Sequence, residues 1–381
     1  MRLSLINSVA DLRELARRRI PRALFEYADR GAYDEVTLQR NRRDLEALQF
    51  RQRVLLDVSQ LVLATTLAGQ DATIPLAIGP TGLAGLFHAD GEMRAARAAE
   101  AFGIPFCLST LSICSIEDVR GAVRRPFWFQ LYLMRDRGFN AELIERAKAA
   151  QCPVLMVTVD MPLQGLRRRD AKNGLSIPPR LTLANAFDIA TKPGWALRVL
   201  RGRRRTFGNV EALRKKAGDN LSTLSQWIGS QFDPTVTWQD IQWVRERWPG
   251  RLVVKGILDA ADAELACAHG IDAIVVSNHG GRQLDGGPST ISVLPEIVAT
   301  ARGRIEVLHD GGVRCGQDVL KALALGARGC LIGKSFLYAL AALGEAGVTR
   351  LLEILRDELR VSMALTGSLD VAAVQRDVLR S

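Results

Sequence analysis

Short apolar runs recur along the chain, and stretches with helical periodicity separate them. The runs are rich in β-branched and aromatic residues and are bounded by glycine, proline or polar residues, which is typical of buried strands. Eight such runs are present: Pro75–Pro80, Pro105–Ser109, Trp128–Tyr132, Val154–Asp160, Leu252–Gly256, Ala273–Asn278, Ile305–Asp310 and Gly329–Gly333. The amphipathic stretches between them include Glu92–Phe102, Ala141–Ala150, Ala260–His269, Ile291–Ala301 and Gly316–Leu325. Alternating strands and helices predict parallel βαβ units.

Eight such units close a (β/α)8 TIM barrel, so we expect the α/β class and this architecture. The alternative is an open doubly wound sheet, whose nucleotide site follows an early strand with a GxGxxG loop. No such loop follows the first runs. The length of 381 residues suits one elaborated barrel, and we expect residues 1–381 to form a single domain.

Two parts of the chain depart from this rhythm. Leu3–Tyr33 precedes the first run and is expected to form an N-terminal helical cap, in which Pro21 can begin a second helix and Gly31 can end it. About 90 residues separate the fourth run from the fifth, where a crossover needs far fewer. Residues 161–237 are therefore expected to contain an insertion next to the carboxyl ends of the strands.

Polar residues and glycines stand at the last position of the runs or just after it. Because the carboxyl ends of barrel strands meet at one mouth, these scattered residues are expected to line a single pocket. They are Thr81, Gly82, Ser109, Gln130, Tyr132, Thr158, Asp160, Lys255, His279, Arg282, Asp310, Arg314, Gly333 and Lys334.

The most informative stretch is Ser277–Gly286, which reads SNHGGRQLDG directly after the sixth run. His279 and Arg282 stand three residues apart, and the neighbouring glycines let backbone and ligand approach closely. A base next to a fixed cation suits the removal of a proton from a substrate whose anionic end the cation holds. The chain has only 4 histidines, which makes this placement informative.

The last two runs carry the signs of a phosphate site. Asp310-Gly311-Gly312-Val313-Arg314 follows run seven, and Gly333-Lys334 follows run eight. The loops after strands 7 and 8 are the usual phosphate site of this barrel, so a phosphorylated cofactor or substrate is expected. Lys255 ends another apolar strand and could be a Schiff-base nucleophile or a cation that stabilises negative charge on a reduced ring. Neither a metal-ligand cluster nor a CxxC pair is present, so we expect no metal.

Several of these segments closely resemble the FMN-dependent L-2-hydroxy acid dehydrogenase/oxidase family. They are Tyr27–Ala32, Phe129–Tyr132, Thr158–Asp160, Val254–Gly256, Ser277–Asp285 and Asp310–Arg314, and the resemblance runs in order from about residue 5 to residue 375. Asp160–Phe187 and Trp195–Gly208 look more like the bacterial membrane-associated members, which include L-lactate dehydrogenases, than like the soluble oxidases.

The resemblance implies FMN as cofactor and a role for each site residue. His279 would take a proton from the substrate and Asp160 would orient it, while Arg282 and Arg167 would hold the substrate carboxylate. The other substrate contacts would come from Tyr132, which we count with the catalytic residues, and Tyr27. Cofactor contacts would come from Thr81, Gly82, Ser109, Gln130, Thr158, Lys255, Ser277, Asp310, Gly311, Gly312, Arg314, Gly333 and Lys334.

Some assignments have structural alternatives. Asp160 could only cap a structure, Tyr27 could belong to the core, and Arg168 could replace its neighbour Arg167. Lys334 stands where the family usually has arginine, which removes a bidentate fork from the phosphate site. The sequence also leaves open whether the substrate loses a hydride or passes through a carbanion.

Two positions limit the choice of substrate and of electron acceptor. Leu111 stands where soluble glycolate oxidases carry tryptophan, and a short aliphatic tail suits it, so L-lactate is the favoured substrate and pyruvate the product. Gly82 stands where many oxidases have alanine, which favours a respiratory quinone or carrier over oxygen. A mandelate-type dehydrogenase and an oxygen-using oxidase remain alternatives, as does, from another class, an FMN isomerase of the isopentenyl diphosphate type.

The net charge of +10 is concentrated in one segment. Residues 160–215 hold 13 Lys and Arg against 4 Asp and Glu. If 195–205 is a helix, Trp195 and Val199 share one side while Arg198, Arg201 and Arg205 share another. This pattern is typical of a segment at a membrane interface, with Trp195 as an aromatic anchor and the arginines as cations for anionic lipid. We therefore expect peripheral binding to the anionic cytoplasmic face of the inner membrane, next to a quinone. An RNA-binding patch and a solvated loop are the alternatives, and no RNA motif supports nucleic-acid binding. The family resemblance also implies a homo-oligomer, a tetramer or a multiple of it.

Overall fold

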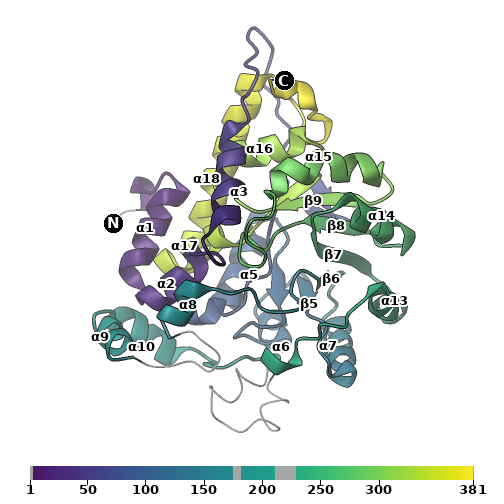
Figure 1. Cartoon of the computed structure of the whole chain (residues 1–381). Coiled ribbons are helices and arrows are strands. Elements are labelled where there is room, and N and C mark those ends of the chain that lie inside the picture. The colour runs from purple at the N-terminus through teal and green to yellow at the C-terminus, as the bar shows by residue number, and fades with distance from the viewer. Residues whose placement is uncertain (1–2, 175–181, 211–228, 381) are drawn as a thin grey trace.

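Eight parallel strands form a closed barrel at the centre of the molecule (Figure 1). The computed structural model describes residues 3–174, 182–210 and 229–380. The strands are β3 (Leu76–Ile78), β4 (Cys107–Ser109), β5 (Trp128–Leu131), β6 (Val154–Thr158), β7 (Arg251–Ile257), β8 (Ala273–Val276), β9 (Glu306–Asp310) and β10 (Gly329–Ile332). They pair in the order β3-β10-β9-β8-β7-β6-β5-β4, and a parallel bridge between Ile78 and Phe106 closes the ring. The predicted (β/α)8 barrel is confirmed. Seven of its strands lie within the predicted apolar runs, and β7 extends one residue beyond its run at each end.

Helices surround the barrel, as the alternating pattern predicts. The crossover helices are α5 (Gly91–Phe102), α7 (Arg137–Ala149), α13 (Trp238–Arg247), α14 (Ala260–Ala268), α15 (Thr290–Ala301), α16 (Gly316–Ala324) and α17 (Lys334–Leu343). The short helices α4 (Ala84–Phe87) and α6 (Ile116–Arg120) and the long C-terminal α18 (Glu345–Thr366) complete this layer. The hairpin of β1 (Thr65–Leu67) and β2 (Gln70–Ala72) contributes Leu67, Ala68 and Ala72 to the barrel's inner apolar cluster.

Strand alternation explains how the barrel interior continues into a polar mouth. Met156, Val253, Val275 and Leu308 belong to the inner apolar cluster of the barrel. Side chains two positions further along a strand point to the same side. The residues that follow them by two are Thr158, Lys255, Ser277 and Asp310. The polar residues at the strand ends therefore turn inward at the carboxyl mouth.

The N-terminal cap consists of α1 (Val9–Arg19) and α2 (Arg22–Asp29), with α3 (Val36–Ala47) after them. Ser8 and Asp11 form a capping box at the start of α1, and Pro21 stands at the N-cap of α2. Figure 1 shows α1 and α2 next to α17. This packing brings Tyr27 of α2 to the barrel mouth.

The predicted insertion carries α8 (Arg168–Lys172), α9 (Leu183–Ala190) and α10 (Pro193–Arg201), which lie on one side of the barrel in Figure 1. Residues 175–181 and 211–228 of this region lie outside the described residues. The expected role of Trp195 as an exposed membrane anchor is wrong, because the indole Nε1 donates to the Leu86 carbonyl at 2.7 Å and the ring packs on the core. Arg198 is also half-buried. Helices α9 and α10 form a helical hairpin, and its exposed apolar side chains are instead Leu183, Phe187, Leu197 and Leu200.

Candidate functional site

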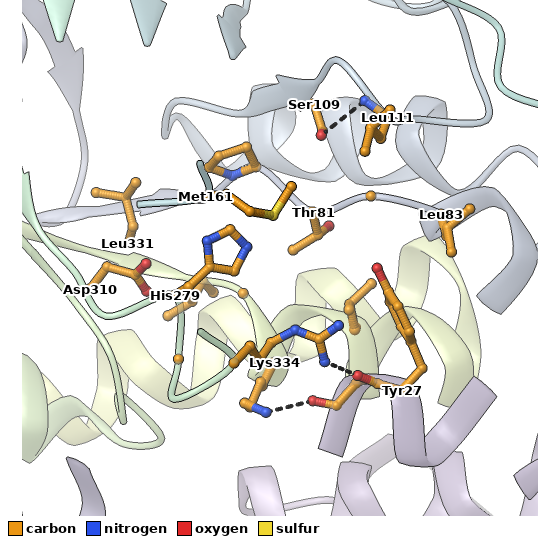
Figure 2. Close-up of a pocket in the computed structure, with 18 of the residues that line it drawn as sticks. Tyr27, Thr81, Leu83, Ser109, Leu111, Met161, His279, Asp310, Leu331 and Lys334 are labelled. Atoms are coloured by element: carbon orange, nitrogen blue, oxygen red, sulfur yellow. Dashed lines mark hydrogen bonds between the residues drawn. The ribbon is translucent and has the colours of Figure 1, made fainter. Parts of the chain in front are cut away.

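A cavity of about 310 Å³ opens at the carboxyl ends of the barrel strands. Figure 2 shows Tyr27 and His279 pointing toward the same space, with Met161 and Thr81 beside it. Most of the predicted site residues line this cavity: Tyr27, Thr81, Gly82, Ser109, Tyr132, Arg167, Lys255, His279, Arg282, Asp310, Gly311, Gly312, Arg314, Gly333 and Lys334. Gln130, Thr158, Asp160 and Ser277 are the predicted residues that stand one layer behind, in contact with or next to the lining.

His279 and Asp160 form a partly buried pair. Nδ1 of His279 lies 2.9 Å from Oδ1 of Asp160. Burial raises the pKa of Asp160, but the facing imidazole, its hydrogen bond and Lys255 outweigh burial and leave the pKa below its ordinary value. Burial lowers the pKa of His279 more than Asp160 raises it. At neutral pH the pair is therefore a carboxylate that accepts from the Nδ1–H of a neutral imidazole, which leaves Nε2 with a free lone pair.

The backbone holds His279 in an unusual conformation. His279 has φ +56°, in the left-handed region, a strained conformation that persists where the surroundings enforce it. Its neighbour Asn278 exchanges two 2.8 Å amide hydrogen bonds with Asn41 of α3, and Asn278 Oδ1 also accepts from the Gly281 amide. This network fixes the turn that carries the imidazole.

Lys255 lines the same cavity and is paired with a second carboxylate. Its Nζ lies 2.8 Å from Ser277 Oγ and 2.8 Å from Asp310 Oδ2. Burial lowers the pKa of Lys255, but Asp310 and Asp160 outweigh it and leave the pKa raised. A lysine that stays protonated cannot attack a carbonyl, so the Schiff-base alternative is disfavoured. A fixed ammonium here suits the stabilisation of negative charge instead.

Two guanidinium groups face the cavity near Tyr27. Arg282 lies over the Tyr27 ring, 4.4 Å from its centroid, and donates to the Tyr27 carbonyl. Arg167 donates to the Arg282 carbonyl and to Gln283 Oε1, both at 3.3 Å. Burial and the charge of Arg282 lower the pKa of Arg167 to about 10. Asp170 is the nearby carboxylate, but neither guanidinium forms an ion pair with it or with another carboxylate among the described residues. Two cations held this close therefore favour an incoming carboxylate.

The structure decides between the adjacent arginines. Arg168 forms an ion pair with Asp34 and is more than half exposed, whereas Arg167 lines the cavity. The alternative assignment to Arg168 is therefore disfavoured. The sequence alone could not choose between Arg167 and Arg168, because the path of the backbone decides which of two adjacent side chains points into the cavity.

Tyr132 adds a hydrogen-bond donor to the cavity. Its ring packs edge-on against Phe232 at 5.6 Å. Burial, followed by the charge of Asp160, raises the pKa of Tyr132, so its hydroxyl stays protonated. Met161, Leu83 and Leu111 provide apolar surface in the same wall. A small molecule with one anionic end and one apolar end fits this combination.

The other end of the cavity fits a flavin phosphate and ring. Gln130 Nε2 is buried and has no hydrogen-bond partner among the described residues, so a ring carbonyl would satisfy it. Ser109 Oγ and the Gln130 amide are already hydrogen-bonded to each other at 3.1 Å. The guanidinium of Arg314 makes no hydrogen bond to the described part of the chain and faces the cavity. Helix α17 starts at the cavity with Gly333 as a cap that has no side chain to occupy its amides.

Lys334 lines the same cavity but is engaged elsewhere. Its Nζ donates to the carbonyls of Ala28 at 2.8 Å, Asp29 at 3.3 Å and Arg30 at 2.9 Å. The structure therefore directs it to the end of α2 rather than to an open phosphate position.

Sequence reasoning missed several residues of the site. Asn41 lies far from the site segments in the sequence, and only the packing of α3 next to α15 brings it to Asn278. Asp170 and Phe232 line the cavity from the insertion and its end. Burial raises the pKa of Asp170 despite the nearby Arg282. The only sequence signal for Asp170 was its position, three residues after the predicted substrate ligand Arg167.

The chain is similar to known proteins over almost its whole length. A family model described as FMN-dependent dehydrogenase matches residues 16–381. The L-lactate dehydrogenase of Caulobacter vibrioides (strain NA1000 / CB15N) is 50% identical over 377 residues, which cover 98% of each chain. The L-lactate dehydrogenase of Stenotrophomonas maltophilia (strain R551-3) is 49% identical over 376 residues, with 98% and 99% covered.

Solved structures share the fold over the whole chain. The monotopic membrane protein (S)-mandelate dehydrogenase matches with a TM-score of 0.93 and 36% identity, covering 98% of this chain and 99% of that one. Mandelate oxidase matches with a TM-score of 0.84 and 38% identity, covering 98% of each chain. In the described residues, no helix combines the length and the apolar character needed to cross a bilayer.

Proposed function

Since the chain belongs to the FMN-dependent dehydrogenase family, we propose that this FMN enzyme oxidises an L-2-hydroxy acid, L-lactate in the first place, to the 2-keto acid. The observation that carries this proposal is the His279–Asp160 pair in one cavity with two guanidinium groups. A base and a carboxylate clamp in the same small cavity match a substrate that carries an acidic end and an adjacent hydroxyl. The relatives at about half identity, which are L-lactate dehydrogenases, favour pyruvate as the product.

The roles of the residues follow from their protonation states. Arg282 and Arg167 hold the carboxylate, and Tyr132 donates a hydrogen bond to the substrate. Nε2 of His279 takes a proton from the substrate, and Asp160 stabilises the imidazolium that forms. FMN, when bound, would supply the acceptor for the two electrons and for the second proton that the substrate loses. The ammonium of Lys255 supplies positive charge at the ring edge where negative charge gathers on reduction.

The proposed cofactor contacts divide into residues for the flavin ring, the ribityl chain and the phosphate. Ser109, Gln130 and Thr158 would hold the polar edge of the ring, with Thr81, Gly82 and Ser277 beside it. Asp310 would contact the ribityl chain. Arg314, Gly311, Gly312, Gly333 and the start of α17 would surround the phosphate.

The matching structures favour a second substrate class. Two solved relatives carry mandelate in their names, so an aryl 2-hydroxy acid is the alternative. The more similar relatives are lactate enzymes, and Leu111 in the cavity wall suits a short tail. Lactate therefore stays the first choice.

The hairpin of α9 and α10 supports peripheral membrane binding. Four apolar side chains are exposed there: Leu183 (91%), Phe187 (74%), Leu197 (50%) and Leu200 (57%). Arg201, Arg203 and Arg205 follow them and are exposed. Apolar side chains next to cations suit an anionic bilayer surface, and one matching structure is a monotopic membrane protein. We place the enzyme on the cytoplasmic side of the inner membrane, where a quinone or another respiratory carrier takes the electrons.

A second apolar surface supports self-association into a tetramer or a multiple of it. Val54, Leu55 and Leu56 are exposed, as are Leu365 and Leu369. Hydrogen bonds join the two segments, for example from the Arg53 amide to the Leu365 carbonyl at 3.1 Å. Leu55 is fully exposed in the left-handed region, at φ +59°, and its side chain gains nothing within the chain for this strain. Light scattering of the purified protein tests this assembly, and a monomer would contradict it.

An anaerobic substrate panel tests the proposed reaction. The purified protein should be yellow, and L-lactate should bleach its flavin absorbance without oxygen. Reoxidation is then compared between a quinone and oxygen. Bleaching by L-mandelate but not L-lactate would favour the alternative substrate, and no bleaching with any 2-hydroxy acid would refute the proposal.

A further inference from the structure

Helix α2 ends at the site, and its last carbonyls are all satisfied by cations. The final carbonyls of an α-helix have no partner within the helix. The Tyr27 carbonyl accepts from Arg282, and the next three accept from Lys334. The positive charges also complement the negative end of the helix dipole. The end of α2 is therefore capped by one residue from the substrate clamp and one from the phosphate segment.

Helix α17 holds α2 at a second point. One turn after Lys334, the hydroxyl of Tyr338 donates to Asp29 Oδ1 at 2.7 Å. Arg13 of α1 grips the same carboxylate through two hydrogen bonds of 2.6 and 2.7 Å. The side chain and the main chain of α2 are thus both fixed to the helix that begins at the phosphate segment.

The contacts of Lys334 leave it little to offer a phosphate directly. An ammonium has three N–H donors, and three carbonyls already accept them. The direct donors that remain are Arg314 and the amides at the start of α17. Burial, followed by the charge of Arg282, lowers the pKa of Lys334 well below its ordinary value. A phosphate dianion nearby would favour the charged form that caps α2.

We propose that Lys334 is a positioning residue that locks the C-terminal end of α2 to α17 and so couples the phosphate end of the site to Tyr27 and Arg282 at the substrate end. The coupling rests on the proposed function, because it assigns the substrate carboxylate to Arg282. It predicts that the cofactor tightens substrate binding through α2 without touching the substrate there.

The test compares Lys334→Met with Lys321→Met. Lys321 is a matched control, because its Nζ also caps the end of a helix, α3, at the Leu45 carbonyl at 2.7 Å. Hydrogen exchange of the FMN-loaded proteins is the first readout. Lys334→Met should speed exchange in residues 26–32, and Lys321→Met should do so near residue 45 only. Unchanged exchange in residues 26–32 would overturn the proposal whatever the substrate proves to be.

Binding measurements separate positioning from direct phosphate contact. The dissociation constant of pyruvate from the loaded enzyme, read from the flavin spectrum, should rise about 10-fold or more in Lys334→Met, which is the scale of a lost charged hydrogen bond. FMN affinity should fall by only a few-fold. A loss of FMN affinity of about 100-fold or more, with pyruvate binding intact in the loaded fraction, would instead make Lys334 a direct phosphate ligand.

Tyr338→Phe gives a milder version of the same test. It removes the hydrogen bond to Asp29 and keeps every charge near the phosphate. The variant should raise exchange in residues 26–32 and weaken pyruvate binding while leaving FMN affinity unchanged. If the two variants exchange faster than wild type in residues 26–32 while no 2-hydroxy acid bleaches the flavin of the wild-type enzyme, the proposed function fails and the lock between α2 and α17 stands.

Discussion

Replacing Asp160 by asparagine tests the pair on which the proposed chemistry depends. The substitution keeps the size of the side chain and removes the charge that faces His279 Nδ1. The N–O distance of 2.9 Å places the charge centres roughly 4 Å apart, which is worth about 4 kcal/mol at an effective dielectric constant near 20. Each ~1.4 kcal/mol is about a factor of ten in rate, so flavin reduction should slow by about 10³-fold.

The assay is anaerobic stopped-flow reduction of the flavin by saturating L-lactate. The dissociation constant of pyruvate should change little, because Arg282 and Arg167 are untouched. Asp160 is also one of the groups that raise the pKa of His279. Its removal should therefore move the acid limb of the pH–rate profile to lower pH, since the base must be unprotonated to act.

Asp310→Asn is the matched control, because it removes a carboxylate from the same mouth that pairs with Lys255 rather than with His279. It should leave the acid limb where it is. A reduction rate in Asp160→Asn within tenfold of wild type, or an acid limb that moves to higher pH, would refute the assignment of His279 as a base supported by Asp160.

Three further predictions concern the clamp, the core and the membrane surface. Arg282→Met should raise the KM for L-lactate by about 100-fold, the scale of a broken buried charge pair, and steady-state kinetics with an unchanged KM would contradict the clamp. Burial lowers the pKa of His309 from 6.5 to about 4. As the pH falls, the unfolded chain therefore binds a proton at this residue before the folded state does. Up to about 3 kcal/mol of folding stability is lost as the pH falls from 6.5 toward 4. Denaturant unfolding at pH 7.5 and 5 should show a smaller loss for His309→Gln than for wild type; equal losses would refute it. Changing Leu183, Phe187, Leu197 and Leu200 to serine should abolish sedimentation with anionic vesicles and leave lactate-dependent dye reduction intact, whereas Leu55→Ser should still sediment; retained binding of the fourfold variant would remove the hairpin from the membrane.

The barrel could be predicted because its signal is local. Apolar runs such as Val154–Asp160 repeat eight times, and the period-2 alternation within each run sets which residue turns inward at the mouth. The stretch Ser277–Asp285 carries a specific family resemblance, which predicts His279 and Arg282 at the mouth, and the end of the run Leu252–Gly256 predicts Lys255 there. All three line the cavity.

Contacts between segments far apart in the sequence could not be predicted in this way. Only the fold shows that Asn41 supports the turn of His279, or that the donors of Lys334 reach the end of α2. The helix expected over 195–205 ends at Arg201, so Arg205 lies beyond it, and the side assigned to the membrane was wrong, since Trp195 turns to the protein. Periodicity gives the angle between side chains on one helix, and packing against the rest of the molecule decides which face is covered.

The sequence by itself determined the strands, their inward residues and the types of side chain at the mouth, because each depends on neighbours a few positions apart. The tertiary structure decided which arginine faces the cavity and which apolar side chains stay exposed. It also decided that Lys255 pairs with Asp310 and that His279 pairs with Asp160. These depend on distances and burial that exist only after the ring of strands has closed.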